Sequence, residues 1–149
     1  MTAIEQKEQA MGRFSAEVEL ANNFDVLREQ AGEMCPDQVR RIRIREVVDS
    51  GATRLVISEA MALQLGRDTS RSAKVRFRYA DGHTAERAIA EQIHLTYGGR
   101  HSVFNAIVEP GRESALIGAI VLEDLDFLVD CVAQRLTPRD PNQIISEVE

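Results

Sequence analysis

Residues 46–53 read Glu46-Val47-Val48-Asp49-Ser50-Gly51-Ala52-Thr53, an apolar segment that carries a carboxylate into a turn. Asp and Ser side chains hydrogen-bond nearby backbone, and the missing Cβ of Gly51 lets a neighbouring carboxylate or another chain approach closely. By itself such a string is ordinary loop chemistry. Its meaning depends on what the remaining sequence places around it.

The segments around this turn have the patterns of β-strands. Alternation of apolar and polar side chains is typical of a strand with one buried face. These patterns predict strands over residues 11–22, 40–48, 74–79, 92–97 and 103–108. The arginines of the second segment are interpreted as a solvated strand face. Turn signals rich in Gly, Asp and Pro separate several of the strands.

Helix is scarce. A helix is predicted over 59–65 behind a Ser58 cap, another over 119–125, and a third is suggested at 25–30. Several short antiparallel strands with one or two brief helices predict an all-β chain. We therefore expect a barrel or sandwich rather than a βαβ nucleotide-binding fold.

Length and composition bound the function. A chain of 149 residues has room for one domain, which we place at 11–138, with flexible polar tails at 1–10 and 139–149. The proportions of 44% hydrophobic and 28% charged residues exclude collagen-like, coiled-coil and wholly disordered classes. The net charge of −6 has the wrong sign for a protein held to phosphates, so no nucleic-acid partner is expected.

The sequence carries no pattern for a metal, a cofactor or a membrane. Cys35 and Cys131 are far apart, and His83, His94 and His101 lack ligand spacing, so we predict neither a disulfide framework nor a metal site. No export signal is recognised at the N-terminus. The longest apolar stretch is well short of the ~20 residues that a membrane-spanning helix needs. We expect a cytoplasmic protein.

The turn at Asp49 resembles the catalytic loop of retropepsin-like aspartic proteases, in which two apolar residues precede Asp-(Ser/Thr)-Gly-(Ala/Ser/Thr). That family has a second element downstream, two apolar residues and a glycine that lead into a helix, and Leu116-Ile117-Gly118 matches it. The hairpin turn Ala80-Asp81-Gly82 lies where the family places its mobile flap. The resemblance covers about residues 11–138 and is strongest to small single-lobe bacterial members.

The resemblance implies a closed β-barrel lobe of the acid-protease fold and a role for each matching residue. Asp49 carries the catalytic carboxylate. The implied supporting residues are Ser50, Gly51, Ala52 and Thr53 in the catalytic loop, Leu116, Ile117 and Gly118 beneath it, and Ala80, Asp81 and Gly82 at the flap tip.

Peptide hydrolysis by carboxylates needs two of them sharing one proton, but Asp-Ser-Gly occurs once in this chain. A chain this short does not hold two lobes, whereas a twofold homodimer places the same residue of each copy face to face. The sequence therefore predicts a homodimeric aspartic endopeptidase that hydrolyses extended peptide segments with Asp49 from both copies.

Three positions depart from the family pattern. Retroviral members carry Asp at the position of Thr53 and Arg at that of Ala119, and that pair braces their dimer. Both charges are missing together, which leaves no orphan charge but weakens the predicted bracing. Ala52 lacks a hydroxyl that pepsin-like lobes often have, so we expect a pH optimum less acidic than that of pepsin.

Two alternatives remain open at the level of sequence. In the first, the chain is a catalytically silent retropepsin-fold module for dimerisation or peptide binding. In the second, it is an unrelated β-barrel binding protein in which Asp49 lies in an ordinary turn.

Overall fold

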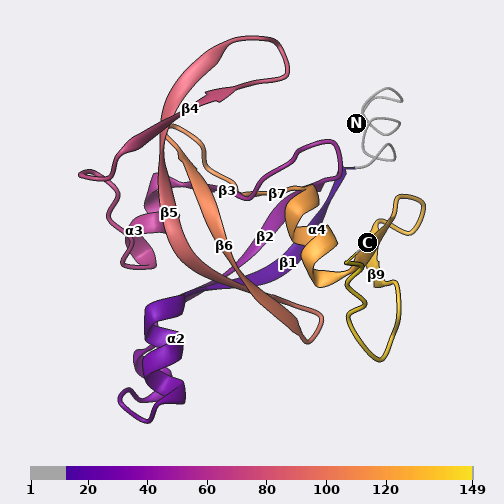
Figure 1. The fold of residues 1–149 in the computed structure, drawn as a ribbon, viewed down its shortest axis with the longest axis horizontal. Coiled ribbons are helices and arrows are strands. Elements are labelled where there is room, and N and C mark those ends of the chain that lie inside the picture. The colour runs from indigo at the N-terminus through magenta and orange to yellow at the C-terminus, as the bar shows by residue number, and fades with distance from the viewer. Residues whose placement is uncertain (1–12, 149) are drawn as a thin grey trace.

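The computed structural model describes residues 13–148, and the predicted N-terminal tail at 1–10 lies outside them. The described strands are β1 (Arg13–Asn22), β2 (Arg41–Asp49), β3 (Val56–Ser58), β4 (Lys74–Arg78), β5 (Thr84–Tyr97), β6 (Arg100–Glu109), β7 (Leu116–Ile117), β8 (Phe127–Asp130) and β9 (Arg135–Pro138) (Figure 1). The helices are α2 (Asn23–Gln30), α3 (Glu59–Gln64) and α4 (Ala119–Leu125), with a 3₁₀ turn η1 (Pro36–Gln38). None of the helices in this part of the chain is long and apolar enough to cross a membrane.

The strand pairings run in the order β1-β2-β7-β3-β6-β5-β4, and β1 also pairs with β5, so the hydrogen-bonding circuit returns to its first strand. β4 lies outside this circuit and pairs with β5. Most pairs are antiparallel, but β2 runs parallel to β7 and β3 runs parallel to β6. The predicted strand-rich architecture with a few short helices is confirmed.

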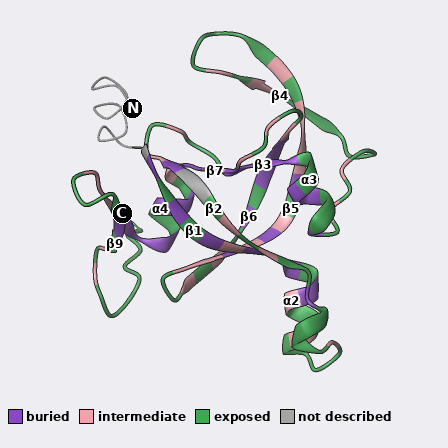
Figure 2. Cartoon of the chain, turned by 180° about the vertical axis from the view of Figure 1, so that it is seen from behind, coloured by how far each residue is buried: buried purple, intermediate pink, exposed green. Residues whose placement is uncertain are grey.

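The core is built from one face of these strands together with residues of α3, α4, β8 and β9 (Figure 2). The alternation predicted for β1 is confirmed, because Phe14, Ala16, Val18 and Leu20 are at most 8% exposed. On β2 the arginines face solvent as predicted, and Arg41 pairs with Glu19 across the strands at 3.3 Å. Apolar burial of this kind is the main stabilising contribution to the fold.

Two strand predictions differ from the structure. β4 was expected to bury one face, but Val75 is 45% exposed, because this edge strand belongs to a hairpin that projects from the body (Figure 1). β5 begins at Thr84 rather than at residue 92. Its pairing with β6 shifts in register between Ala90 and Ile93. The buried residues are therefore Ala90 before the shift and Ile93 and Leu95 after it, and no single alternation runs through the strand.

The helix predictions hold closely. α4 spans 119–125 as predicted, and the Ser58 side chain caps α3 by accepting a hydrogen bond from the amide of Met61 at 3.1 Å. α2 begins at Asn23, two residues earlier than suggested, because Asn22 serves as its N-cap.

Residues 139–148 have no regular secondary structure but make specific contacts. Asp126 accepts a hydrogen bond from the amide of Ile145 at 3.0 Å and pairs with Arg139 at 2.9 Å. Arg100 donates to the carbonyl oxygens of Asp140 and Gln143. The flexibility predicted for this segment and the domain boundary at 138 stay predictions.

A buried carboxylate joins α2 to the residue that precedes β2. Asp25 has no exposed surface, and its oxygens accept from Nε and Nη2 of Arg40 at 2.8 and 2.9 Å and from the Arg40 amide at 3.1 Å. These hydrogen bonds hold the pKa of Asp25 below its ordinary value, against the opposing effect of burial. A Cβ at Gly66 would lie 2.0 Å from Nη1 of Arg40, so glycine there makes room for the guanidinium.

Asp25→Asn is expected to lower the free energy of unfolding by about 2 kcal/mol, because charge-assisted hydrogen bonds are lost. The pKa of Asp25 is lowered in the folded state, so its contribution is present above the ordinary Asp pKa of about 3.9 and is lost as pH falls through the folded value. Urea unfolding at several pH values measures this. The exposed pair Glu17–Arg43 supplies the control Glu17→Gln, which should change little. Equal stability of Asp25→Asn and the parent protein at neutral pH would contradict the assignment.

Candidate active site

Asp49 is the last residue of β2 and is half-buried where the strand passes into the loop 50–55. Its Oδ1 accepts a hydrogen bond from the Gly51 amide at 2.9 Å, and its carbonyl accepts from the Ala52 amide at 3.1 Å. A Cβ on Gly51 would lie 3.3 Å from the same Oδ1, closer than ordinary van der Waals contact. Glycine at 51 therefore lets the backbone approach the carboxylate that the sequence singled out.

β7 is inserted between the two strands that flank this loop. Leu116 and Ile117 pair in parallel with residues 47 and 48 of β2, and Leu116 also pairs antiparallel with Val56 of β3. Ile117 is buried and Leu116 is half-buried. The structure thus brings the second predicted element directly beside the Asp49 strand.

Gly118 packs against the backbone of the loop. A Cβ at this position would lie 2.6 Å from the Arg54 carbonyl oxygen and 2.7 Å from the Arg54 nitrogen, so no larger residue fits without movement. The backbone φ of −99° is open to any residue, and the requirement for glycine is therefore spatial.

The first amides of α4 bind the same loop. The amide of Ala119 donates to the Ala52 carbonyl at 2.8 Å, and that of Ile120 donates to the Thr53 carbonyl at 2.9 Å. The first amides of a helix have no partner within it, so this loop satisfies two of them. The loop conformation is thereby coupled to α4.

The predicted flap residues form the turn of the β4–β5 hairpin. Ala80, Asp81 and Gly82 are all exposed, and the Gly82 amide donates to the Tyr79 carbonyl at 2.9 Å. Asp81 accepts from the His83 amide at 3.0 Å and contacts the His83 ring, and these hydrogen bonds lower the pKa of Asp81. The turn is confirmed, and its role as a flap stays a prediction.

Sequence reasoning missed a contact between this hairpin and the end of β6. The Tyr79 hydroxyl donates to Oε1 of Glu109 at 2.6 Å, and the Tyr79 ring stacks on His83 with centroids 4.4 Å apart. Burial, followed by the Glu109 hydrogen bond, raises the pKa of Tyr79, so the phenol keeps the proton it donates. The two residues are 30 positions apart, and no local pattern announces their contact.

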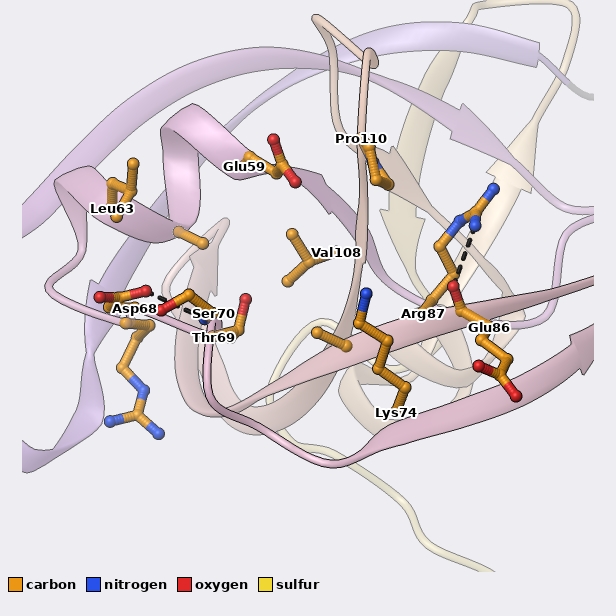
Figure 3. A pocket seen from close by; sticks show the side chains of 13 residues that line it. Glu59, Leu63, Asp68, Thr69, Ser70, Lys74, Glu86, Arg87, Val108 and Pro110 are labelled. Atoms are coloured by element: carbon orange, nitrogen blue, oxygen red, sulfur yellow. Dashed lines mark hydrogen bonds between the residues drawn. The ribbon is translucent and has the colours of Figure 1, made fainter.

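A hollow of about 280 Å³ lies beside the hairpin (Figure 3). Residues of α3 and of the segment 67–70 line one part of it, and residues of β4 and β5 line another. Its charged lining includes Glu59, Lys74, Glu86 and Arg87. No residue of the Asp49 loop lines it. It is therefore separate from the candidate active site.

Comparison with known proteins settles the family. A family model described as gag-polyprotein putative aspartyl protease matches residues 38–124, which is more than half of the chain. The chain belongs to this family. The matched segment contains the Asp49 loop, the hairpin turn and Gly118, so the retropepsin-like resemblance seen in the sequence is confirmed, and an unrelated β-barrel protein is excluded.

Among solved structures, the chain is similar to EIAV protease complexed with the inhibitor HBY-793. The identity is 18% and the TM-score is 0.49, with 76% of this chain and 88% of that chain covered. A search of the curated proteins finds no match.

Two positions where this family member lacks the retroviral charges lie on adjoining segments. Thr53 is exposed and Ala119 is half-buried, and the segments that carry them are joined by the backbone hydrogen bonds from α4 to the loop. Backbone contacts within one chain therefore order this region without the charged side chains.

Gly118→Ala is expected to reduce the free energy of unfolding by about 2 kcal/mol, because the added methyl group forces the loop and α4 apart. Gly111→Ala is the control: Gly111 has φ of +76° and open space around it, so that variant measures backbone strain alone, about 1 kcal/mol. Urea unfolding compares the two. A Gly118→Ala variant as stable as the parent protein would show that the loop is not tightly packed.

Tyr79→Phe is expected to increase hydrogen exchange of the β4–β5 hairpin amides about tenfold, since a hydrogen bond to a charged group is lost. Mass spectrometry of exchanged peptides measures the effect. Tyr97→Phe is the matched control, because no hydrogen bond of the Tyr97 hydroxyl is found within residues 13–148. Unchanged exchange in Tyr79→Phe would mean that the hairpin is held by other contacts.

Proposed function

We propose that the protein is a homodimeric aspartic endopeptidase that hydrolyses extended peptide segments, with Asp49 of each copy in one shared site. The observation that carries the proposal is the position of Asp49 at the end of β2, in a loop packed against Gly118 and α4, inside the segment that matches the aspartyl protease family. This packing presents the carboxylate on a rigid support.

The chemistry requires a second carboxylate. One ionised carboxylate takes a proton from water as it attacks the scissile carbonyl, while a protonated partner donates to the carbonyl oxygen. The proton then passes to the leaving amine as the C–N bond breaks. Residues 50–58 contain no Asp or Glu, so the same chain offers no such partner next along the loop. A twofold axis near the loop supplies it from a second copy.

The hairpin offers a way to hold an extended peptide. β4 pairs along one edge with β5, and its other edge belongs to no strand pair among the described residues. A peptide that lies between the hairpin and the Asp49 loop can add to such an edge through main-chain hydrogen bonds, while its side chains enter pockets. This mode of binding suits a protease that acts on unfolded segments.

Asp49→Asn is expected to reduce cleavage of a peptide library by about a thousandfold or more, because proton transfer to and from the carboxylate is lost. The variant should keep the folded state and the solution mass of two chains. Asp37→Asn, at an exposed position in η1, is the matched control and should keep full activity.

Retained cleavage by Asp49→Asn would contradict the proposal. A wild-type dimer that binds extended peptides but cleaves none would instead identify the chain as a silent peptide-binding member of the family.

A further inference from the structure

We propose that Arg54 selects peptides with an acidic side chain, by pairing with that side chain where the peptide passes between the Asp49 loop and the β4–β5 hairpin. The inference rests on the proposed function and names the class of substrate that the same site takes.

Arg54 connects the two structures between which a peptide would lie. Its backbone belongs to the Asp49 loop and packs against Gly118, where a Cβ would lie within 2.7 Å of the Arg54 nitrogen and carbonyl oxygen. Its guanidinium carbon lies 5.4 Å from the ring centroid of Phe77 on β4. The side chain therefore reaches from the floor of the candidate site to the hairpin above it.

The contact with Phe77 orients the guanidinium without using its donors. A guanidinium placed over an aromatic ring interacts through its face, so the N–H groups at its edge remain available. Arg54 is exposed, and within residues 13–148 it makes no side-chain hydrogen bond and no ion pair. An edge of this kind fits the two oxygens of a carboxylate.

Arg54 differs in this respect from several other arginines of the fold. Those that have acidic partners within the chain are Arg40 with Asp25, Arg41 and Arg43 with Glu19, Arg76 with Glu86, and Arg139 with Asp126. An arginine held next to the candidate active site without such a partner is available to an incoming ligand.

Few acidic groups compete for Arg54. The segment 50–58, which contains it, carries no acid. The acidic residues near the hairpin tip are engaged elsewhere, Glu109 by Tyr79 and Asp81 by His83. An acidic side chain that reaches Arg54 therefore meets a positive charge with no acid of the same segment beside it.

The test starts from peptides that the wild-type protein is shown to cleave in a digest. At each position of such a peptide in turn, a version with Glu is compared with a version with Gln. At one position the Glu peptide should be cleaved with a kcat/KM about fivefold higher than that of the Gln peptide, through a lower KM, as expected of a partly exposed ion pair. Arg54→Gln should remove this preference. Arg54→Glu should reverse it, so that a Lys peptide is cleaved best.

Arg28→Glu makes the same change of charge on α2, at the far end of the molecule from the hairpin (Figure 1), and should keep the preference for Glu. Raising the salt concentration should weaken the preference of the wild type, since exposed charges are screened.

Failure of this inference is distinguishable from failure of the proposed function. If the wild type cleaves peptides without preferring Glu anywhere, or if Arg54→Glu keeps the preference, the role of Arg54 is overturned and the protease stands. If the wild type cleaves nothing, the protease is overturned, and fluorescence anisotropy of labelled Glu and Gln peptides then tests Arg54. Tighter binding of the Glu peptide that reverses in Arg54→Glu supports the inference, and equal binding overturns it.

Discussion

The close approach of Gly118 to the backbone of the Asp49 loop is the constraint on which the rest of the site depends. No side chain fits there, and the first amides of α4 complete the contact by binding the carbonyls of Ala52 and Thr53. β7 reaches this point by lying between the strands that flank the loop. Segments far apart in the sequence therefore pack into one unit that presents the Asp49 carboxylate, and the proposed catalysis requires a carboxylate positioned in this way.

The hairpin is attached to this unit in a different way. None of residues 74–87, which form its projecting part, is buried. Beyond the continuation of β5 into the sheet, a hydrogen bond from Tyr79 to Glu109 and the cation–π contact of Arg54 with Phe77 join this part to the body. A segment held by a few polar contacts opens at lower free-energy cost than one held by core packing. A packed loop beside a more weakly held hairpin suits the proposed function, in which an extended peptide enters and leaves between them.

Much of this organisation could be predicted from local pattern. The alternation along β1, the cap at Ser58 and the span of α4 are each written in neighbouring residues, and the Asp49 turn and Gly118 could be recognised together as a family pair. β3 and β7 have three and two residues, too few for any periodicity, so their pairing follows only from tertiary structure. The shift of register in β5 and the bond from Tyr79 to Glu109 likewise depend on residues that meet only after folding.

The central claim is that two copies of Asp49 form one site, and a crystal structure of the full chain tests it most directly. The account predicts a twofold axis beside the loop, with the two Asp49 carboxylates facing each other within hydrogen-bonding distance, about 3 Å. A dimer in solution whose crystal structure places Asp49 on an outer surface, away from any second copy, would contradict it.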